Sequence, residues 1–183
     1  MTTATLLTGR EARLASEELI VSKTDRQGRL TYVNDTFLKV SGYTEESLIG
    51  QPHSMVRHPA MPRAVFRLLW NRLESGREVF AYVVNKTVDG GYYWVFAHVT
   101  PSLGATGAVV GYHSSRRAPG TVAIDRIRPL YDRLLAVEAA VHGARAQADA
   151  GYQALEQELT AAGLTYDELI WQITDAHLAG ASR

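Results

Sequence analysis

The sequence predicts an α+β fold: a five-stranded antiparallel sheet with short helices around a ligand pocket, followed by a C-terminal α-helical extension. Two β-rich runs joined by turn residues stand near the start, at 18–23 and 30–33. Further strands separated by hairpin turns are indicated between 79 and 115. Beyond Ala118-Pro119-Gly120 the composition changes to alanine, glutamate, glutamine and leucine, which favour helix.

The region between the two groups of strands carries helix start and stop signals. Asn34 or Asp35 can cap a short helix that Gly42 ends, and a second short helix follows it. From Pro62 to Gly76 apolar residues recur at helical spacing, which predicts the longest helix of the first half. The middle of the domain is therefore expected to consist mainly of short helices.

The strand expected at 92–100 is largely apolar on both faces, because side chains alternate along a strand. One face carries Tyr93, Val95, Ala97 and Val99, and the other carries Tyr92, Trp94, Phe96 and His98. A small antiparallel sheet normally leaves one face in water. We therefore expect the aromatic face to be covered, either by a helix of this chain or by a second subunit.

The extension contains apolar residues that step by three and four, as in a coiled-coil seam: Ile127, Leu130, Leu134, Val137, Val141, Ala144 and Ala148. The seam weakens toward Gly143 and Gly151, so packing on its own domain and pairing in a homodimer are equally compatible with it. A capping box at 165–168 indicates a last helix. The expected segments are an N-terminal cap at 1–18, a main domain at 19–118 and the helical extension at 119–183.

The composition excludes several classes of function. Lys and Arg total 19 and so do Asp and Glu, which gives no net field for nucleic acid or an anionic membrane. The absence of cysteine excludes disulfides, cysteine nucleophiles and photoadduct chemistry of the phototropin type. The longest apolar runs are far shorter than the roughly 18–20 residues of a membrane span. We expect a cytoplasmic protein.

The most unusual segment is 51–62, followed within one helix length by Trp70. It combines three prolines, two histidines and one arginine in twelve residues. A simple hydrophobic core requires no such mixture. We interpret the segment as a clamp that closes over a ligand.

The order of these elements is that of PAS domains. The chain resembles, over roughly residues 19 to 117, the flavin-binding PAS domain of bacterial aerotaxis receptors. The motifs that carry the resemblance are Tyr32-Val33-Asn34-Asp35-Thr36-Phe37, Ser41-Gly42-Tyr43-Thr44, Gln51-Pro52-His53, Met55-Val56-Arg57-His58-Pro59, Met61-Pro62 and Tyr93-Trp94-Val95. The Met-Val-Arg-His-Pro run is much more specific than the generic Tyr-Val-Asn and Gly-Tyr signals.

The resemblance implies a PAS domain that holds FAD noncovalently and reports redox state through it. Arg57, His58 and Trp70 match family residues needed for flavin binding. Asn34 and Asn85 match polar positions near the pocket. The receptors continue into a membrane anchor and a signalling region, so this shorter chain is expected to act as a free-standing sensor.

The chemistry of a flavin pocket explains these residue types, since the ring needs a flat apolar slot and hydrogen-bond donors. Trp70 can stack, Arg57 can bind phosphate or carbonyl oxygens, and the Asn85 amide can bond the pyrimidine edge. The alternative interpretation makes Trp70 a core residue and Arg57 a surface ion-pair partner.

The histidines have structural alternatives as well. A neutral His58 could bond the ligand or simply hold its loop, and for His53 a role in organising the loop is favoured. His98 and His113 fall on strands and are expected at the surface or an interface, with His98 on the outer face. No pair of histidines or carboxylates has ligand spacing, so no metal site is expected, and motifs of common enzymes are absent.

These observations favour a PAS sensor that binds FAD and reports redox state or oxygen to a partner protein. The expected signal path leads from the flavin through Asn85 to the outer face at Trp94 and Phe96, and then to the flanking helices. A haem sensor with a histidine ligand is an alternative. Another is a ligand-free interaction or dimerisation module, which Ala60 favours because an aspartate commonly stands there in the family.

Overall fold

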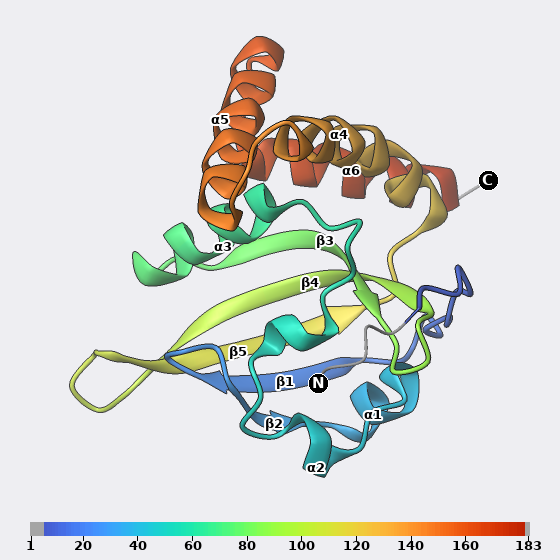
Figure 1. Ribbon diagram of the computed structural model, residues 1–183, viewed down its shortest axis with the longest axis vertical. Coiled ribbons are helices and arrows are strands. Elements are labelled where there is room, and N and C mark those ends of the chain that lie inside the picture. The colour runs from blue at the N-terminus through green and yellow to red at the C-terminus, as the bar shows by residue number, and fades with distance from the viewer. Residues whose placement is uncertain (1–5, 182–183) are drawn as a thin grey trace.

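Five antiparallel strands form one curved sheet in the order β2-β1-β5-β4-β3 (Figure 1). The computed structural model describes residues 6–181, with side chains described as far as residue 175. The strands are β1 (Ile20–Asp25), β2 (Leu30–Val33), β3 (Val79–Lys86), β4 (Tyr92–Leu103) and β5 (Val109–Arg117). The predicted five-stranded antiparallel sheet is therefore confirmed.

Short helices and one longer helix lie between β2 and β3. They are α1 (Asp35–Ser41), α2 (Glu45–Leu48), the 3-10 helix η1 (His53–Val56) and α3 (Arg63–Glu74). Asn34 caps α1 by accepting a hydrogen bond from the Phe37 backbone, and Gly42 ends it in the left-handed region at φ 73°. These are the start and stop signals that the sequence contains. Together the four helices occupy the concave side of the sheet, which we call the inner face.

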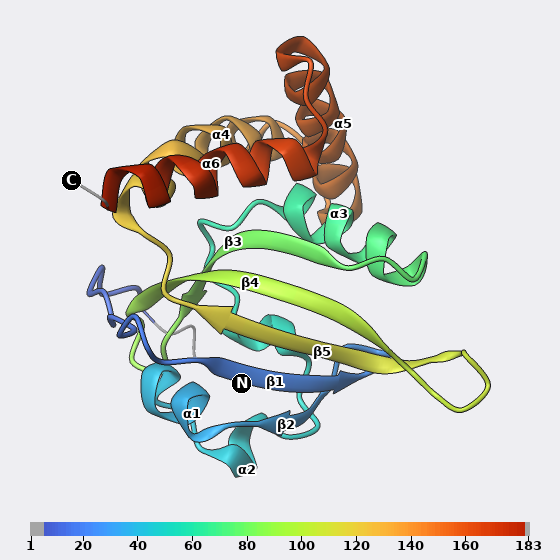
Figure 2. The same cartoon turned by 180° about the vertical axis from the view of Figure 1, so that it is seen from behind.

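The extension forms three helices near the β3 edge of the sheet: α4 (Thr121–Ala139), α5 (Ala144–Ala162) and α6 (Tyr166–Ala181). Helices α4 and α6 contact the other side of the sheet, which we call the outer face, and α5 packs against α3 and α4 (Figure 2). The predicted seam does not continue as one helix, because the chain turns between Ala139 and Ala144. Ile127, Leu130 and Leu134 are buried in α4, whereas Val137 is exposed. The first part of the seam thus packs on its own domain.

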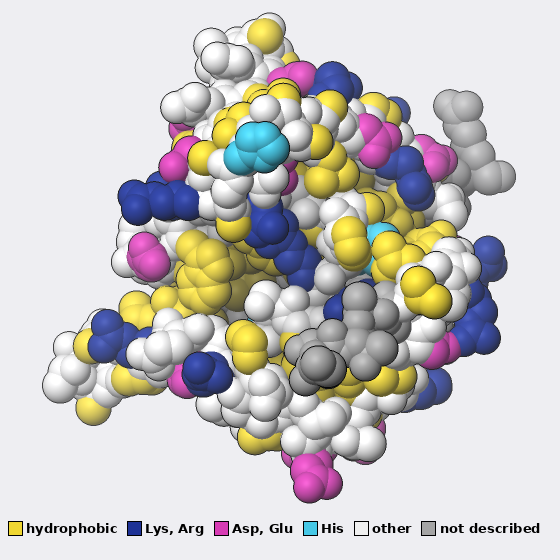
Figure 3. Space-filling model, viewed as in Figure 1, with side chains coloured by type: hydrophobic (Ala, Val, Ile, Leu, Met, Phe, Trp, Pro, Cys, Tyr) yellow, Lys and Arg dark blue, Asp and Glu magenta, His cyan; other side chains and the backbone are white. Residues whose placement is uncertain are grey.

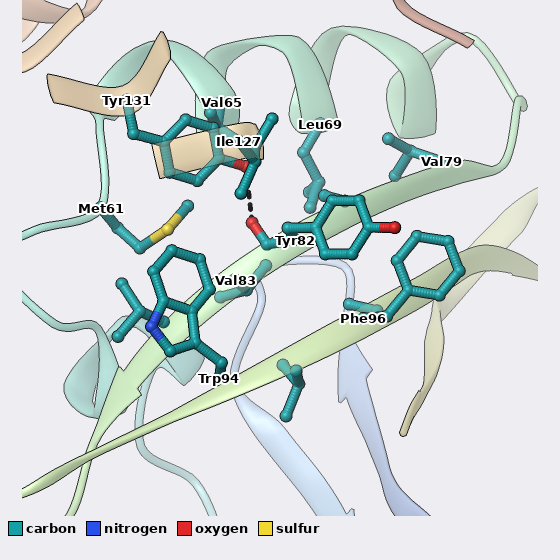
Figure 4. Close-up of a cluster of buried hydrophobic side chains, with 14 of the residues drawn as sticks. Met61, Val65, Leu69, Val79, Tyr82, Val83, Trp94, Phe96, Ile127 and Tyr131 are labelled. Atoms are coloured by element: carbon teal, nitrogen blue, oxygen red, sulfur yellow. Dashed lines mark hydrogen bonds between the residues drawn. The ribbon is translucent and has the colours of Figure 1, made fainter. Parts of the chain in front are cut away.

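The aromatic side chains of the outer face pack against this extension (Figure 4). The Trp94 ring stacks on Tyr131 of α4 with a centroid distance of 6.3 Å. The Tyr131 hydroxyl donates to the Tyr82 carbonyl at 2.6 Å, and the Tyr82 and Thr174 hydroxyls lie 2.8 Å apart. Helices of this chain therefore cover the aromatic face, which is the first of the two predicted arrangements.

Two further observations bear on the expectations from sequence. His98 lies on the outer side as predicted, stacked on Phe80 at 4.2 Å and bonded to Glu78 at 2.7 Å. In the described part of the chain, no helix is long and apolar enough to cross a membrane.

Candidate functional site

A cavity of about 360 Å³ lies between α3, η1 and the inner face of the sheet. Figure 3 shows the corresponding hollow, with hydrophobic side chains on its floor and Lys or Arg side chains toward the helical layer. Its volume lies near the lower end of the range for ligand pockets, about 300–1,000 Å³. The lining of the cavity includes Ser22, Gly28, His53, Ser54, Arg57, Phe66, Leu69, Trp70, Leu73, Val83, Asn85, Ala97, Val99, Tyr112, Ser114 and Arg116.

The cavity is an apolar slot between one helix and the sheet. Phe66, Leu69, Trp70 and Leu73 reach it from α3 because they recur at helical spacing. Val83, Ala97 and Val99 form the opposite wall because alternate side chains of β3 and β4 face inward. The slot is therefore bounded on both sides by side chains that suit a flat apolar ring.

Trp70 stands at one end of the slot, where Gly28 makes room for it. The Trp70 ring meets the edge of Tyr112 with a centroid distance of 5.2 Å. A Cβ atom at Gly28 would lie 3.1 Å from the Trp70 ring, and the positive φ of 76° also disfavours any other residue there. The turn between β1 and β2 thus helps to position a wall of the cavity.

Three buried polar side chains at the slot have atoms without a hydrogen-bond partner among the described residues. They are Asn85 Nδ2, Ser114 Oγ and Arg116 Nη1. The side chains are nearly inaccessible, at 2%, 6% and 5% of their full exposure. An unpaired buried polar atom costs about 1–3 kcal/mol. Such a cluster fits a ligand that accepts hydrogen bonds.

Arg116 and His53 form a polar network at the end of this cluster. Arg116 Nη2 lies 2.6 Å from His53 Nε2 and donates to Ser22 Oγ at 2.9 Å. Burial and the Arg116 charge lower the pKa of His53 to about 3, and burial lowers the pKa of Arg116 to about 10. His53 is therefore the neutral acceptor and Arg116 the charged donor at pH 7.

Arg57 borders the cavity where the clamp segment meets α3. Its Nη2 donates to the Met61 carbonyl at 3.0 Å, and its guanidinium lies 4.5 Å from the centre of the Phe66 ring. Its backbone pairs with that of Asn85 in an isolated bridge. Burial, and then the charge of Arg63, lower its pKa. The clamp is thus attached directly to the end of β3 that carries Asn85.

Two of the predicted site residues lie outside the cavity lining. His58 accepts a hydrogen bond from the Ala60 backbone at Nδ1, 3.1 Å away, which is its structural alternative. Asn34 uses its amide to bind the backbone at Val21, Phe37 and Leu19. The Asn34 amide is thus engaged by the protein backbone, and it lies outside the cavity lining.

Sequence reasoning missed Ser114 and Arg116. A strand residue faces the same side as residues two and four positions away, and Tyr112, Ser114 and Arg116 all line the cavity. From the sequence alone, an arginine on a strand is expected at the surface unless it is known which face of that strand is buried. The signal was the alternation in β5, which places a charge on the buried side.

No group of His, Cys, Asp or Glu among the described residues could hold a metal ion.

Comparison with known proteins gives a consistent picture. The PAS fold family matches residues 11–114. The aerotaxis receptor of Escherichia coli (strain K12) is 41% identical over 128 residues, which are 70% of this chain and 25% of the receptor. The nitrogen fixation regulatory protein of Klebsiella pneumoniae is 28% identical over 97 residues, 53% of this chain and 20% of that protein. The chain thus spans a quarter or less of these relatives.

Two solved structures show the same fold. The blue-light photoreceptor Aureochrome1 LOV domain in its dark state aligns with a TM-score of 0.52 and 20% identity, over 65% of this chain and 86% of that one. A light-oxygen-voltage domain studied with a flavin analogue aligns with a TM-score of 0.53 and 18% identity, over 63% and 86% of the two chains.

Proposed function

This chain belongs to the PAS family, and we propose that its cavity holds FAD noncovalently and that the protein reports redox state or oxygen to a partner protein. The observation that carries the proposal is the cluster of unpaired polar atoms of Asn85, Ser114 and Arg116 around an apolar slot. The 41% identity with an aerotaxis receptor supports a sensory role. We place the protein in the cytoplasm as part of the same proposal.

The residues present fit a flavin. A flavin ring is flat, with apolar faces and hydrogen-bond acceptors at one edge, and the slot offers apolar walls with donors at one end. The Asn85 amide and the Arg116 guanidinium are the donors suited to carbonyl and ring-nitrogen acceptors. When bound, a flavin supplies reversible uptake of electrons and protons.

The polar network would respond to a change of charge in the cavity. Arg116 stabilises negative charge near Nη1, since this nitrogen has no protein partner among the described residues. Added negative charge would also favour the cation of His53, whose pKa is now held near 3. The hydrogen bonds that Arg116 makes to His53 and to the ligand would therefore change together when the ligand changes its redox state.

Strand β3 offers a route from the cavity to the outer face. Val83 and Asn85 face the cavity, while Tyr82, directly before Val83, bonds Tyr131 and Thr174 of the extension. A small displacement of β3 would change those two contacts together. A bias of a few kcal/mol between two packings is enough to switch a surface that a partner reads.

The two alternatives have less support in the structure. A haem would need an available histidine nitrogen in the cavity, and His53 Nε2 is 2.6 Å from Arg116. A ligand-free module would fill its pocket with side chains, whereas this chain keeps a cavity with unpaired polar atoms. Ala60 does not line the cavity, so its difference from the usual aspartate removes no group from the slot.

The absorbance spectrum of protein purified under mild conditions tests the proposal. We expect flavin bands, either as purified or after reconstitution with FAD, and release of free FAD on denaturation. Trp70→Ala should lose most of the flavin, and Trp171→Ala, which removes a half-exposed ring of α6 away from the cavity, is the matched control that should keep it. A Soret band would favour haem, and a colourless folded protein that takes up no FAD would favour the ligand-free module.

A further inference from the structure

A second concave site of about 580 Å³ adjoins the cavity on the side of the helical extension. Ser54 and Arg57 line both, so the two spaces meet at the clamp segment. We call the second site the extension groove. The clamp segment, α3, α4 and α5 contribute its walls: Ser54, Arg57, His58, Pro59, Met61, Arg63, Leu135, Glu138, Ala139 and Gln147.

Cationic groups stand where the cavity passes into the extension groove. Arg57 lies at the junction and Arg63 lines the groove beyond it. Arg63 Nε donates to Gln147 at 3.0 Å, and its terminal nitrogens make no hydrogen bond to the described residues. A phosphate or pyrophosphate group suits two neighbouring guanidinium groups because each presents a fork of donors.

The carboxylate of Glu138 offsets only part of this charge, because it is one anion beside two guanidinium groups and its oxygens are bonded to the protein backbone. Glu138 is 5% exposed and accepts hydrogen bonds from the backbone nitrogens of Arg63 at 2.9 Å and Ala64 at 2.8 Å. It therefore completes the first turn of α3, whose N-cap Pro62 has no side-chain bond to offer. The groove keeps a cationic character at the junction with the cavity.

The remainder of the extension groove offers apolar surface. Met61, Leu135 and Ala139 line it together with the half-buried ring of His58. Burial, and then the charge of Lys86, lower the pKa of His58, which favours its neutral ring. Apolar side chains beside a neutral imidazole suit a heteroaromatic base such as adenine.

We propose that the extension groove binds the pyrophosphate and adenine half of FAD, so that the C-terminal helices make the protein selective for the dinucleotide. The inference rests on the proposed function, in which the flavin ring occupies the cavity. A cavity of about 360 Å³ suits the ring system but is too small for the whole dinucleotide. The groove continues from it at Arg57, and its lining supplies both cationic groups and apolar side chains.

The proposal makes the extension part of the ligand site. The groove has its shape because α5 packs tightly against α3 and α4 at Gly151, where a Cβ atom would lie 2.5 Å from a Glu138 carboxylate oxygen. Binding of the dinucleotide would therefore hold the extension against α3.

The experiment compares the affinities of riboflavin, FMN and FAD for the full chain by quenching of flavin fluorescence. We expect FAD to bind about tenfold or more tightly than riboflavin. Ala139→Trp fills the groove and should weaken FAD binding by about tenfold while leaving riboflavin within about twofold. Ala136→Trp places the same side chain on the exposed side of α4 and should change neither affinity.

Arg63→Gln gives a second and gentler test. It should weaken FAD and reduce the salt dependence of FAD binding, with no effect on riboflavin. Equal affinities of the wild-type protein for riboflavin and FAD, or equal losses of both in Ala139→Trp while its circular dichroism is unchanged, would overturn the inference and leave the flavin cavity standing. Failure of all three flavins to bind would contradict the proposed function itself.

Discussion

The two faces of the sheet differ in how their buried polar groups are paired, although the Tyr166 hydroxyl at the start of α6 also has no partner among the described residues. On the outer face the hydroxyls of Tyr82 and Tyr131 are paired, with Thr174 and with a backbone carbonyl. On the inner face Asn85, three positions along the same strand from Tyr82, has an amide nitrogen with no partner among the described residues. Because a complete core pairs its buried polar groups, the cluster of unpaired atoms on the inner face supports the proposal that a ligand completes it.

Truncating a buried side chain of the extension, which covers the outer face, should have the largest effect on the free energy of unfolding. Leu134→Ala truncates a fully buried side chain of α4 in the extension and should lower the free energy of unfolding by about 2–5 kcal/mol. Urea denaturation measures the change. Val137→Ala, on the same helix but exposed, is the matched control with an expected change within about 0.5 kcal/mol. Equal losses for the two variants would show that α4 is not docked as described.

Acid should lower the free energy of unfolding through His53 on the inner face. The pKa of His53 is about 3 in the folded chain, against 6.5 for an ordinary histidine. Between these pH values the unfolded chain binds a proton that the folded chain does not, so the free energy of unfolding falls as the pH falls. The slope is at most about 1.4 kcal/mol per pH unit.

Denaturation of the ligand-free protein between about pH 7 and pH 5 measures this slope. His53→Gln should remove much of it, whereas His142→Gln, in the exposed turn after α4, should not. An unchanged slope in His53→Gln would contradict a neutral His53 in the cavity wall.

The contact between α4 and α3 should contribute less to the free energy of unfolding than the burial of Leu134. Glu138→Gln weakens the two hydrogen bonds that complete the first turn of α3 and should lower the free energy of unfolding by about 1–2 kcal/mol. The matched control is Asp125→Asn, an exposed carboxylate of the same helix. If both variants retain wild-type stability, the carboxylate of Glu138 is not the cap of α3.

A pair of polar-to-apolar variants should separate the two faces by the sign of their effect. Thr174→Val removes the partner of Tyr82 and should cost about 1 kcal/mol of stability. Asn85→Leu removes an unpaired buried amide, so the ligand-free protein should be equally stable or more stable by about 1 kcal/mol. Thermal unfolding without ligand measures both. A loss of stability in both variants would mean that the inner face is as complete as the outer one.

The sequence predicted the fold well because its signals are local. Asn34 and Gly42 mark the ends of α1, and alternation assigns Trp94 and Phe96 to the face that the extension covers. The turn between α4 and α5 was not predicted, because alanine-rich helix continues on both sides of it and only Gly143, at φ 95°, marks the change.

The candidate site was predicted only in part. Trp70, Arg57 and Asn85 line the cavity, as the resemblance implied. Arg116 escaped detection because an arginine on a short strand usually lies in solvent, and its burial depends on residues 63 and 94 positions away, His53 and Ser22. Asn34 caps α1 outside the cavity lining, and motif matching alone cannot distinguish a ligand contact from a helix cap. Nonlocal contacts decide such roles.

We propose that the unpaired polar atoms of the inner face bind a flavin. Titration of flavin-free protein with FAD measures this binding. Flavin fluorescence should be quenched to saturation at one FAD per chain. Asn85→Leu should bind FAD about tenfold or more weakly while being at least as stable as the wild-type protein. No saturable binding, or wild-type affinity in Asn85→Leu, would contradict the account.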